Sequence, residues 1–249
     1  MSSQYTLAQI TDCHLFADPS KAGYSGINPY QSLEKVLLEV RKQRPDCVLV
    51  TGDVSGDYSE QSYAHFIQLW QQSGITAPLF SVAGNHDNIG AWQDCFGCKH
   101  EYLSAALGFG HWHLHMLPSE FEGAKGRLKR DATQHMCDNI ESNRDAHHIV
   151  AMHHPLTLSD VWMDKHRLVN PEVFTGYLPM ANLRAVIHGH VHTERKVMLH
   201  KTPIYACPST CWQWGNSVEF SVSEQMPGFR TLKLNEDGHF STMTHYVNT

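Results

Sequence analysis

Apolar and polar stretches alternate in a regular order along the first half of the chain. Short apolar runs at 5–10, 46–50 and 78–83 predict buried strands, and apolar residues at helical spacing in 29–44 and 62–72 predict helices between them. Each predicted strand runs into a loop that is rich in Asp, Asn, His and Gly. This is the α/β pattern, in which functional groups collect outside the carboxyl ends of the strands.

The second half of the chain is richer in predicted strands. The segment 111–117 alternates between histidine and apolar residues, as a strand with one polar and one apolar face does. A helix is predicted at 126–145, and strands are predicted at 147–152 and 184–189. Further β-like segments lie at 195–200, 203–209, 217–223 and 229–235. No repeat or linker-like run interrupts them, so we expect a single domain over residues 1–249.

Composition and charge narrow the classes of function. The chain of 249 residues carries 19 Lys and Arg against 25 Asp and Glu, and its net charge of −6 disfavours binding of a nucleic-acid polymer. Its start resembles no signal peptide, and no apolar run is long enough to cross a membrane. Its seven cysteines show no regular disulfide framework. We therefore expect a cytoplasmic protein with free thiols, a small-molecule ligand and no membrane partner.

The chain has 19 histidines, and several of them follow predicted strands together with Asp and Asn. Imidazole nitrogens and carboxylate or amide oxygens are ligands for ions such as Zn, Fe and Mn. Seven such groups are too many for one tetrahedral ion. They suit two ions that share a carboxylate, for which Asp53 is the candidate. The Asp, Asn and His residues at these strand ends include Asn85, His86 and Asp87, and the seven that the resemblance described next implies as metal ligands are Asp12, His14, Asp53, Asn85, His153, His190 and His192.

The order of these residues resembles the calcineurin-like metallophosphoesterases. The blocks of that family are D-x-H, G-D, G-N-H followed by D or E, a single H, and G-H-x-H, and all occur in order from residue 12 to residue 192. The resemblance is closer still to the bacterial class III cyclic-nucleotide phosphodiesterases of the 3',5'-cyclic-AMP type. It rests there on LAQITDCHLF, HHPL, WMDKHRLVN, CPSTC and GFRTLKLNEDG, and it covers nearly the whole chain.

This resemblance implies an α/β fold in the form of a four-layer α/β/β/α sandwich. It also implies two metal ions per chain, either iron with manganese or two divalent ions such as Mn, Fe or Zn. By similarity, one ion would be held by Asp12, His14, Asp53 and His192. The second would be held by Asp53, Asn85, His153 and His190.

The resemblance further implies a reaction. A hydroxide that bridges the two ions would attack the phosphorus of 3',5'-cyclic AMP and give 5'-AMP. His86 would be the catalytic residue, because it would lie beside the phosphate and stabilise or protonate the leaving 3'-oxygen. Substrate contacts would come from His14, Asp53, Asn85, His86 and His192.

Other functions remain open at this point. The same site in a broader phosphodiesterase would act on 2',3'-cyclic nucleotides, glycerophosphodiesters or nucleotide-sugar lipids. A metal-free scaffold that binds a protein partner would have lost ligands, whereas every block is intact here. The oligomeric state is also open, with a homodimer as one alternative.

Several neighbours of the motifs have roles of their own. His153 aligns with the ligand of the family, whereas the adjacent His154 could contact substrate or water. His188 ends a predicted strand and is expected to be a hydrogen-bonded structural residue. Asp87 is expected to orient the turn that carries His86.

The segment 162–170 also has two interpretations. It resembles a part of the cyclic-nucleotide group that lies near the substrate. The alternative is helix capping and packing by Asp164, Leu168 and Asn170.

Overall fold

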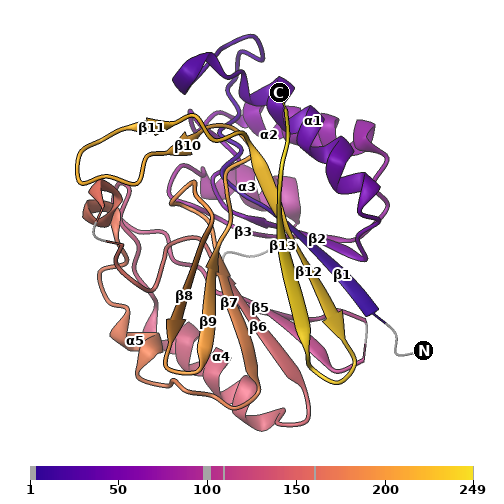
Figure 1. The fold of residues 1–249 in the computed structure, drawn as a ribbon, viewed down its shortest axis with the longest axis vertical. Coiled ribbons are helices and arrows are strands. Elements are labelled where there is room, and N and C mark those ends of the chain that lie inside the picture. The colour runs from indigo at the N-terminus through magenta and orange to yellow at the C-terminus, as the bar shows by residue number, and fades with distance from the viewer. Residues whose placement is uncertain (1–3, 98–101, 109, 160, 249) are drawn as a thin grey trace.

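The computed structural model describes residues 4–97, 102–108, 110–159 and 161–248. Its first sheet has three parallel strands from the start of the chain, extended by two antiparallel strands from the end (Figure 1). In spatial order these strands are β13 (Phe240–Tyr246), β12 (Gly228–Asn235), β1 (Gln4–Ile10), β2 (Cys47–Thr51) and β3 (Leu79–Val82).

The second sheet has four parallel strands at its centre and an antiparallel strand at each edge. Its spatial order is β4 (Leu103–Ala106), β5 (Trp112–Met116), β6 (His147–Met152), β7 (Leu183–His188), β9 (Thr202–Ala206) and β8 (Arg195–Leu199). A short antiparallel ribbon, β10 (Gln213–Trp214) with β11 (Val222–Ser223), stands apart from both sheets.

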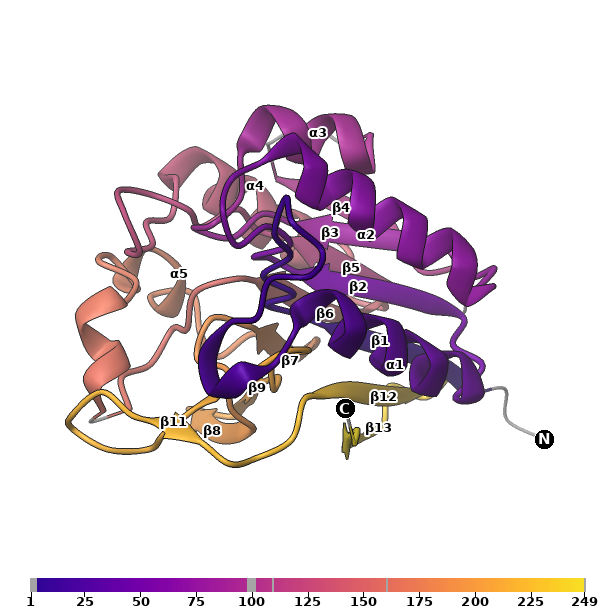
Figure 2. The ribbon, with the colours of Figure 1, turned by 90° about the horizontal axis from the view of Figure 1, so that it is seen from above.

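Helices cover the outer face of each sheet, as the view in Figure 2 shows for the first one. The first sheet is covered by α1 (Pro29–Lys42), α2 (Glu60–Ser73) and α3 (Ile89–Phe96). The second is covered by α4 (Arg130–Ser142) and the single turn α5 (Glu172–Thr175). Two 3₁₀ segments, Tyr24–Gly26 and Trp162–His166, lie in the connecting loops. None of the helices in the described ranges is long and apolar enough to span a bilayer.

Three apolar layers hold this arrangement together. Val50 of β2 packs under the helices of the first sheet, and Val150 of β6 packs under α4. Between the sheets lies a third layer, to which Leu49, Leu114 and Ile187 belong. Because both faces of the central strands are covered, these strands are apolar throughout, as buried parallel strands are. The predicted four-layer α/β/β/α sandwich is confirmed.

The elements of the first half begin and end close to their predicted limits. Helix α1 starts at Pro29, and the side chain of Asn28 caps it by accepting the N–H of Gln31. Helix α2 has a Ser59 cap and ends at Gly74, whose φ of 67° suits glycine.

In the second half of the chain, one helix and one strand are shorter than predicted. The helix predicted from residue 126 starts only at Arg130, because Gly126 and Leu128 hydrogen-bond to the segment that ends at Asn170. The strand predicted at 217–223 is reduced to the two residues of β11. Helix α3 and strands β4 and β13 were not predicted, since none of them has a long periodic pattern.

Candidate metal centre

The loops that follow β1, β2, β3, β6 and β7 meet at one end of the two sheets. Parallel strands point their carboxyl ends the same way, and backbone bonds tie the loops to one another. The N–H groups of Asp12 and His14 donate to Gly52 O (2.9 Å) and Asp53 O (3.0 Å). The Asp12 carboxylate also accepts the N–H of His190 at 3.0 Å, which joins the first sheet to the second. The structure thus brings together all seven predicted ligands.

One group of donor atoms forms around Asp12. The Nε2 atoms of His14 and His192 lie 3.0 Å apart, and His192 Nε2 lies 3.3 Å from Asp12 Oδ1. Asp53 Oδ2 approaches His14 Nε2 to 3.8 Å. Atoms that bind one ion at about 2.1 Å lie roughly 3–3.5 Å apart in a tetrahedral arrangement, so these spacings fit a single ion.

A second group forms on the other side of Asp53. His153 Nε2 lies 3.4 Å from Asp53 Oδ2, 3.2 Å from Asn85 Oδ1 and 3.3 Å from His190 Nδ1. Asp53 Oδ2 therefore faces both groups, while Asp53 Oδ1 accepts the N–H of His86 at 2.7 Å. The two groups contain the residues of the two ligand sets that the family resemblance implies.

Three of the histidines are oriented by backbone carbonyls. The ring nitrogen that faces away from the cluster donates in each case to a carbonyl, and this leaves the other nitrogen free to bind a cation. Metal-binding histidines are typically held in this way. The bonds are His153 Nδ1 to Thr51 O (2.7 Å), His190 Nε2 to His166 O (3.1 Å) and His192 Nδ1 to Trp212 O (2.8 Å). The donor set and its support both fit metal ions.

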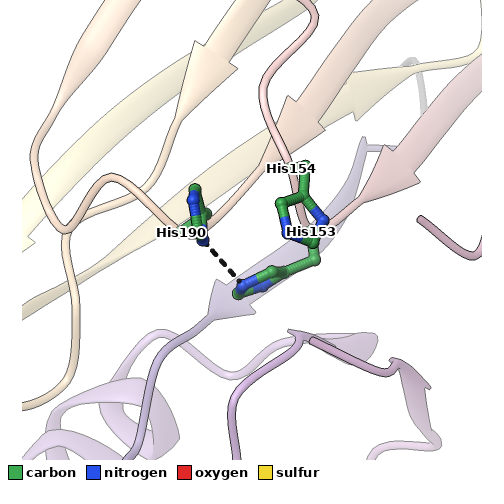
Figure 3. Close-up of side chains that lie close together, drawn as sticks. All are labelled: His153, His154 and His190. Carbon is green, nitrogen blue, oxygen red and sulfur yellow. Dashed lines mark hydrogen bonds between the residues drawn. The ribbon is translucent and has the colours of Figure 1, made fainter. Parts of the chain in front are cut away.

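The adjacent histidines His153 and His154 occupy different positions (Figure 3). His154 Nδ1 bonds to Ser119 Oγ at 3.0 Å, and its buried Nε2 has no hydrogen-bond partner among the described residues. Its ring lies 4.5 Å from the ring of His190. Of these two histidines, His153 is the one whose Nε2 lies within 3.4 Å of Asp53 Oδ2 and 3.2 Å of Asn85 Oδ1. The geometry therefore favours His153 over His154 as the ligand.

The electrostatics of the cluster follow from two buried carboxylates. Burial alone would raise both carboxyl pKa values, but the neighbouring imidazoles outweigh it. His192 lowers the pKa of Asp12 to about 2, and His153 lowers the pKa of Asp53 well below its usual value. Burial would in turn lower the pKa of His153, but the charge of Asp53 raises it to about 10. Burial lowers the pKa of His14 to about 3, so His14 is neutral.

The backbone is strained at most of the candidate ligands. Five of the seven candidates have φ between 44° and 69°, a region that residues other than glycine seldom adopt. These five are Asp12, His14, Asp53, His190 and His192. Glycines make room beside them, since a Cβ at Gly84 would overlap the carboxylate of Asp53.

Asp87 holds the loops after β2 and β3 in place, which extends its predicted role. Its buried carboxylate accepts five hydrogen bonds of 2.8–3.2 Å, four from backbone N–H groups and one from a hydroxyl. Burial and the charge of Asp53 raise its pKa to about 6, which leaves it ionised at pH 7. The donors are the N–H groups of Asp53, Val54, Ser55 and Gly84 and the hydroxyl of Tyr63.

His86 lies beside His14 and Asp53, and one ligand atom from each of the three lies within 4.8 Å of the others. Its backbone is fixed by Asp53, and its ring stacks on Tyr58 at 5.8 Å and meets the edge of His14 at 5.0 Å. Its buried Nδ1 has no hydrogen-bond partner in the described part of the chain. Tyr58 was not predicted, because nothing in its local sequence marks it.

The remaining predicted neighbours have structural contacts. His188 is buried, and its Nδ1 donates to Gly189 O at 2.9 Å. Asn170 bonds through its side chain to both backbone groups of Leu128. Asp164 accepts the N–H of Ser159, and Leu168 is buried in the layer under α4. These contacts agree with the packing interpretation for Asp164, Leu168 and Asn170, whereas Trp162 and His166 of the same segment line cavities beside the cluster.

Two connected cavities open from the cluster. The inner one, of about 100 Å³, is lined by His14, Asp53, Asn85, His86, His190 and His192 among others. The outer one, of about 750 Å³, shares His14, His86 and Trp214 with it among others, and the rest of its lining includes aromatic rings and two lysines. Apart from the segment that contains Trp162, nothing in the sequence indicated that these aromatic residues lie at the site.

The chain belongs to the calcineurin-like phosphoesterase family, whose model matches residues 5–194. It is 35% identical over 242 residues to the 3',5'-cyclic adenosine monophosphate phosphodiesterase CpdA of Pseudomonas aeruginosa, covering 95% of this chain and 88% of that protein. It is 30% identical over 243 residues to the CpdA phosphodiesterase of Haemophilus influenzae, with the same coverage. The family that the ordered motifs predicted is confirmed.

The fold agrees with solved structures. A dimetal phosphatase from Danio rerio superimposes with a TM-score of 0.68 at 12% identity, over 98% of this chain and 99% of that chain. At this identity the likeness establishes the fold alone.

Replacing Asp87 by Asn should loosen the cluster without removing a ligand. One of the accepting oxygens becomes an NH₂ group that faces N–H donors, so we expect about 1–3 kcal/mol less free energy of unfolding. We also expect roughly 10–100-fold weaker Mn²⁺ binding, as when support around a metal ligand is lost. Urea unfolding and metal titration measure the two effects. Asp94→Asn on the exposed side of α3 is the control. Unchanged stability and metal affinity in Asp87→Asn would contradict this role.

Metal binding should release protons near neutral pH. His153 has a pKa of about 10 in the metal-free protein, so it carries a proton at pH 7.5 that a metal ligand must lose. The apparent affinity for Mn²⁺ should therefore rise with pH, and proton release should fade as the pH approaches 10. Calorimetry in buffers of different ionisation enthalpy measures the release. Binding heats that do not depend on the buffer would contradict it.

Proposed function

We propose that this protein hydrolyses 3',5'-cyclic AMP to 5'-AMP with two bound metal ions. The observation that carries the proposal is the position of Asp53. One carboxylate oxygen faces His14 at 3.8 Å and His153 at 3.4 Å, as a group shared by two ions must. The relatives named above as cyclic adenosine monophosphate phosphodiesterases, matched over most of the chain, support this substrate.

The proposed ligand sets follow the two groups of donor atoms. One ion would be held by Asp12, His14, Asp53 and His192, and the other by Asp53, Asn85, His153 and His190. The mixture of imidazole, carboxylate and amide donors suits iron with manganese, or two divalent ions such as Mn, Fe or Zn. When bound, such ions supply a water activated at neutral pH and a positive field for a phosphodiester anion.

The chain itself would bind and orient the phosphate. The five predicted substrate contacts, His14, Asp53, Asn85, His86 and His192, all line the inner cavity, which supports their assignment. The volume of about 100 Å³ suits a phosphate group rather than a whole nucleotide. The rest of the substrate would therefore extend into the outer cavity.

His86 would complete the reaction. Water oxygen forms a bond to phosphorus as the bond from phosphorus to the 3'-oxygen breaks, and that oxygen then needs a proton. A positioned imidazole beside the phosphate can donate it. The ring of His86 lines both cavities, and its Nδ1 is free of other partners among the described groups.

We also propose a cytoplasmic location and a small-molecule phosphodiester as the partner. The cysteines that the structure describes are all free thiols, five of them buried, which supports a reducing compartment.

The first experiment is product identification with a substrate panel. The manganese-loaded protein is incubated separately with 3',5'-cyclic AMP, 2',3'-cyclic AMP, a glycerophosphodiester and bis(p-nitrophenyl) phosphate, and the products are resolved by chromatography. We expect 5'-AMP from the first substrate at the highest kcat/KM. If only another ester is cleaved, the broader phosphodiesterase is supported and the cyclic-AMP assignment is wrong.

His86→Ala should lower kcat by roughly 100-fold, because a general acid contributes about that much or more. Both metal ions should remain, since His86 belongs to neither ligand set. Metal analysis by mass spectrometry and steady-state kinetics on 3',5'-cyclic AMP check the two effects. His135→Ala, on the exposed side of α4, is the control. Loss of metal from the His86 variant would contradict its proposed role.

A further inference from the structure

Five aromatic rings from three separate segments form a continuous wall beside the metal centre. We define this aromatic wall as Tyr24, Trp162, Trp212, Trp214 and Phe220. Their ring centres are close, at 5.0 Å for Tyr24 with Trp214 and 4.9 Å for Trp162 with Phe220. Figures 1 and 2 both place the β10–β11 ribbon, which leads to Phe220, beside the segment that carries Trp162.

The inner rings of the aromatic wall are joined to the metal centre. Trp214 stacks on His192 at 4.7 Å with an interplanar angle of 22°, and Trp212 stacks on His14 at 5.4 Å and 21°. Both histidines are proposed metal ligands. The position of the aromatic wall relative to the ions is thereby fixed by direct contact.

The outer rings are exposed to the cavity. All five rings line the outer cavity of about 750 Å³, together with His14 and His86. Tyr24 is 48% exposed and Phe220 is 52% exposed, and the two rings lie next to each other with their centres 5.8 Å apart. A planar ligand in this cavity would cover these ring surfaces.

The charge of the outer cavity favours an anionic ligand. Lys21 lies over the ring of Phe16 at 3.9 Å, and Lys165 lies over Trp162 at 5.3 Å. Both lysines line the outer cavity, and no Asp or Glu is among the lining residues that the structure describes. Aromatic rings and lysines together suit a ligand in which a planar ring is attached to a phosphate. A glycerol head group has no planar ring that could stack on these side chains.

We propose that the aromatic wall is a base-binding subsite, on which the nucleobase of a nucleotide phosphodiester stacks while its phosphate lies at the metal centre. This inference rests on the proposed function and specifies its substrate class. Stacking of a base on an aromatic side chain is typically lost on substitution by alanine with about a 5–150-fold weaker affinity. Phe220 and Tyr24 are the most exposed rings, so their removal disturbs the fold least.

The test compares two ligands that differ only in the base. The dissociation constants of 5'-AMP and ribose 5-phosphate are measured by calorimetry on the manganese-loaded full chain. The wild type should bind 5'-AMP at least ~10-fold more tightly. Phe220→Ala and Tyr24→Ala should each weaken 5'-AMP about 5–10-fold and change ribose 5-phosphate less than about 2-fold. Val218→Ala is the matched control, because Val218 is 80% exposed in the same loop and does not line the cavity.

If the variants lose affinity for both ligands equally, or lose no affinity for 5'-AMP, the proposed subsite is wrong. Steady-state kinetics on 3',5'-cyclic AMP distinguish a wrong subsite from a wrong reaction. If 3',5'-cyclic AMP is hydrolysed but neither variant raises its KM or weakens 5'-AMP, the subsite is wrong and the reaction stands. If 3',5'-cyclic AMP is not hydrolysed but Phe220→Ala still weakens 5'-AMP selectively, the reaction is wrong and the subsite stands.

Discussion

Two carboxylates, Asp12 and Asp53, are buried side by side at the end of two sheets, at 0% and 2% exposure. Buried negative charge is costly unless positive charge is close. The nearby imidazoles can supply this positive charge, and the negative charge of Asp53 raises the pKa of His153 to about 10, so that His153 is protonated at neutral pH. Metal cations between the same donor atoms would neutralise the two carboxylates more completely. The strained backbone at five ligand positions is consistent with a site that serves binding rather than stability.

The rest of the fold serves to bring these groups together. The layer between the sheets aligns the ends of β1, β2 and β3 with those of β6 and β7, and so each loop delivers its side chain to the same place. Asp87 then joins the loops after β2 and β3 through hydrogen bonds to their backbone. The aromatic rings of Trp212 and Trp214 stack on His14 and His192, two of the proposed ligands.

Much of this could be predicted from the sequence because it is encoded locally. Strands β1, β2 and β3 are short apolar runs that end in polar motifs, and the ordered motifs indicate both the family and the candidate ligands. Features set by distant contacts could not be predicted. The start of α4 depends on the pairing of Gly126 with Arg167, and the aromatic wall joins segments nearly 200 residues apart, from Tyr24 to Phe220.

The account depends on Asp53 as a carboxylate shared by two ions. The most direct measurement is the metal content per chain of the wild type and of Asp53→Ala after reconstitution and removal of free metal. We expect two ions in the wild type and loss of both in the variant, because each proposed ligand set includes this residue. A wild type that holds a single ion, or an Asp53→Ala variant that keeps two, would contradict it.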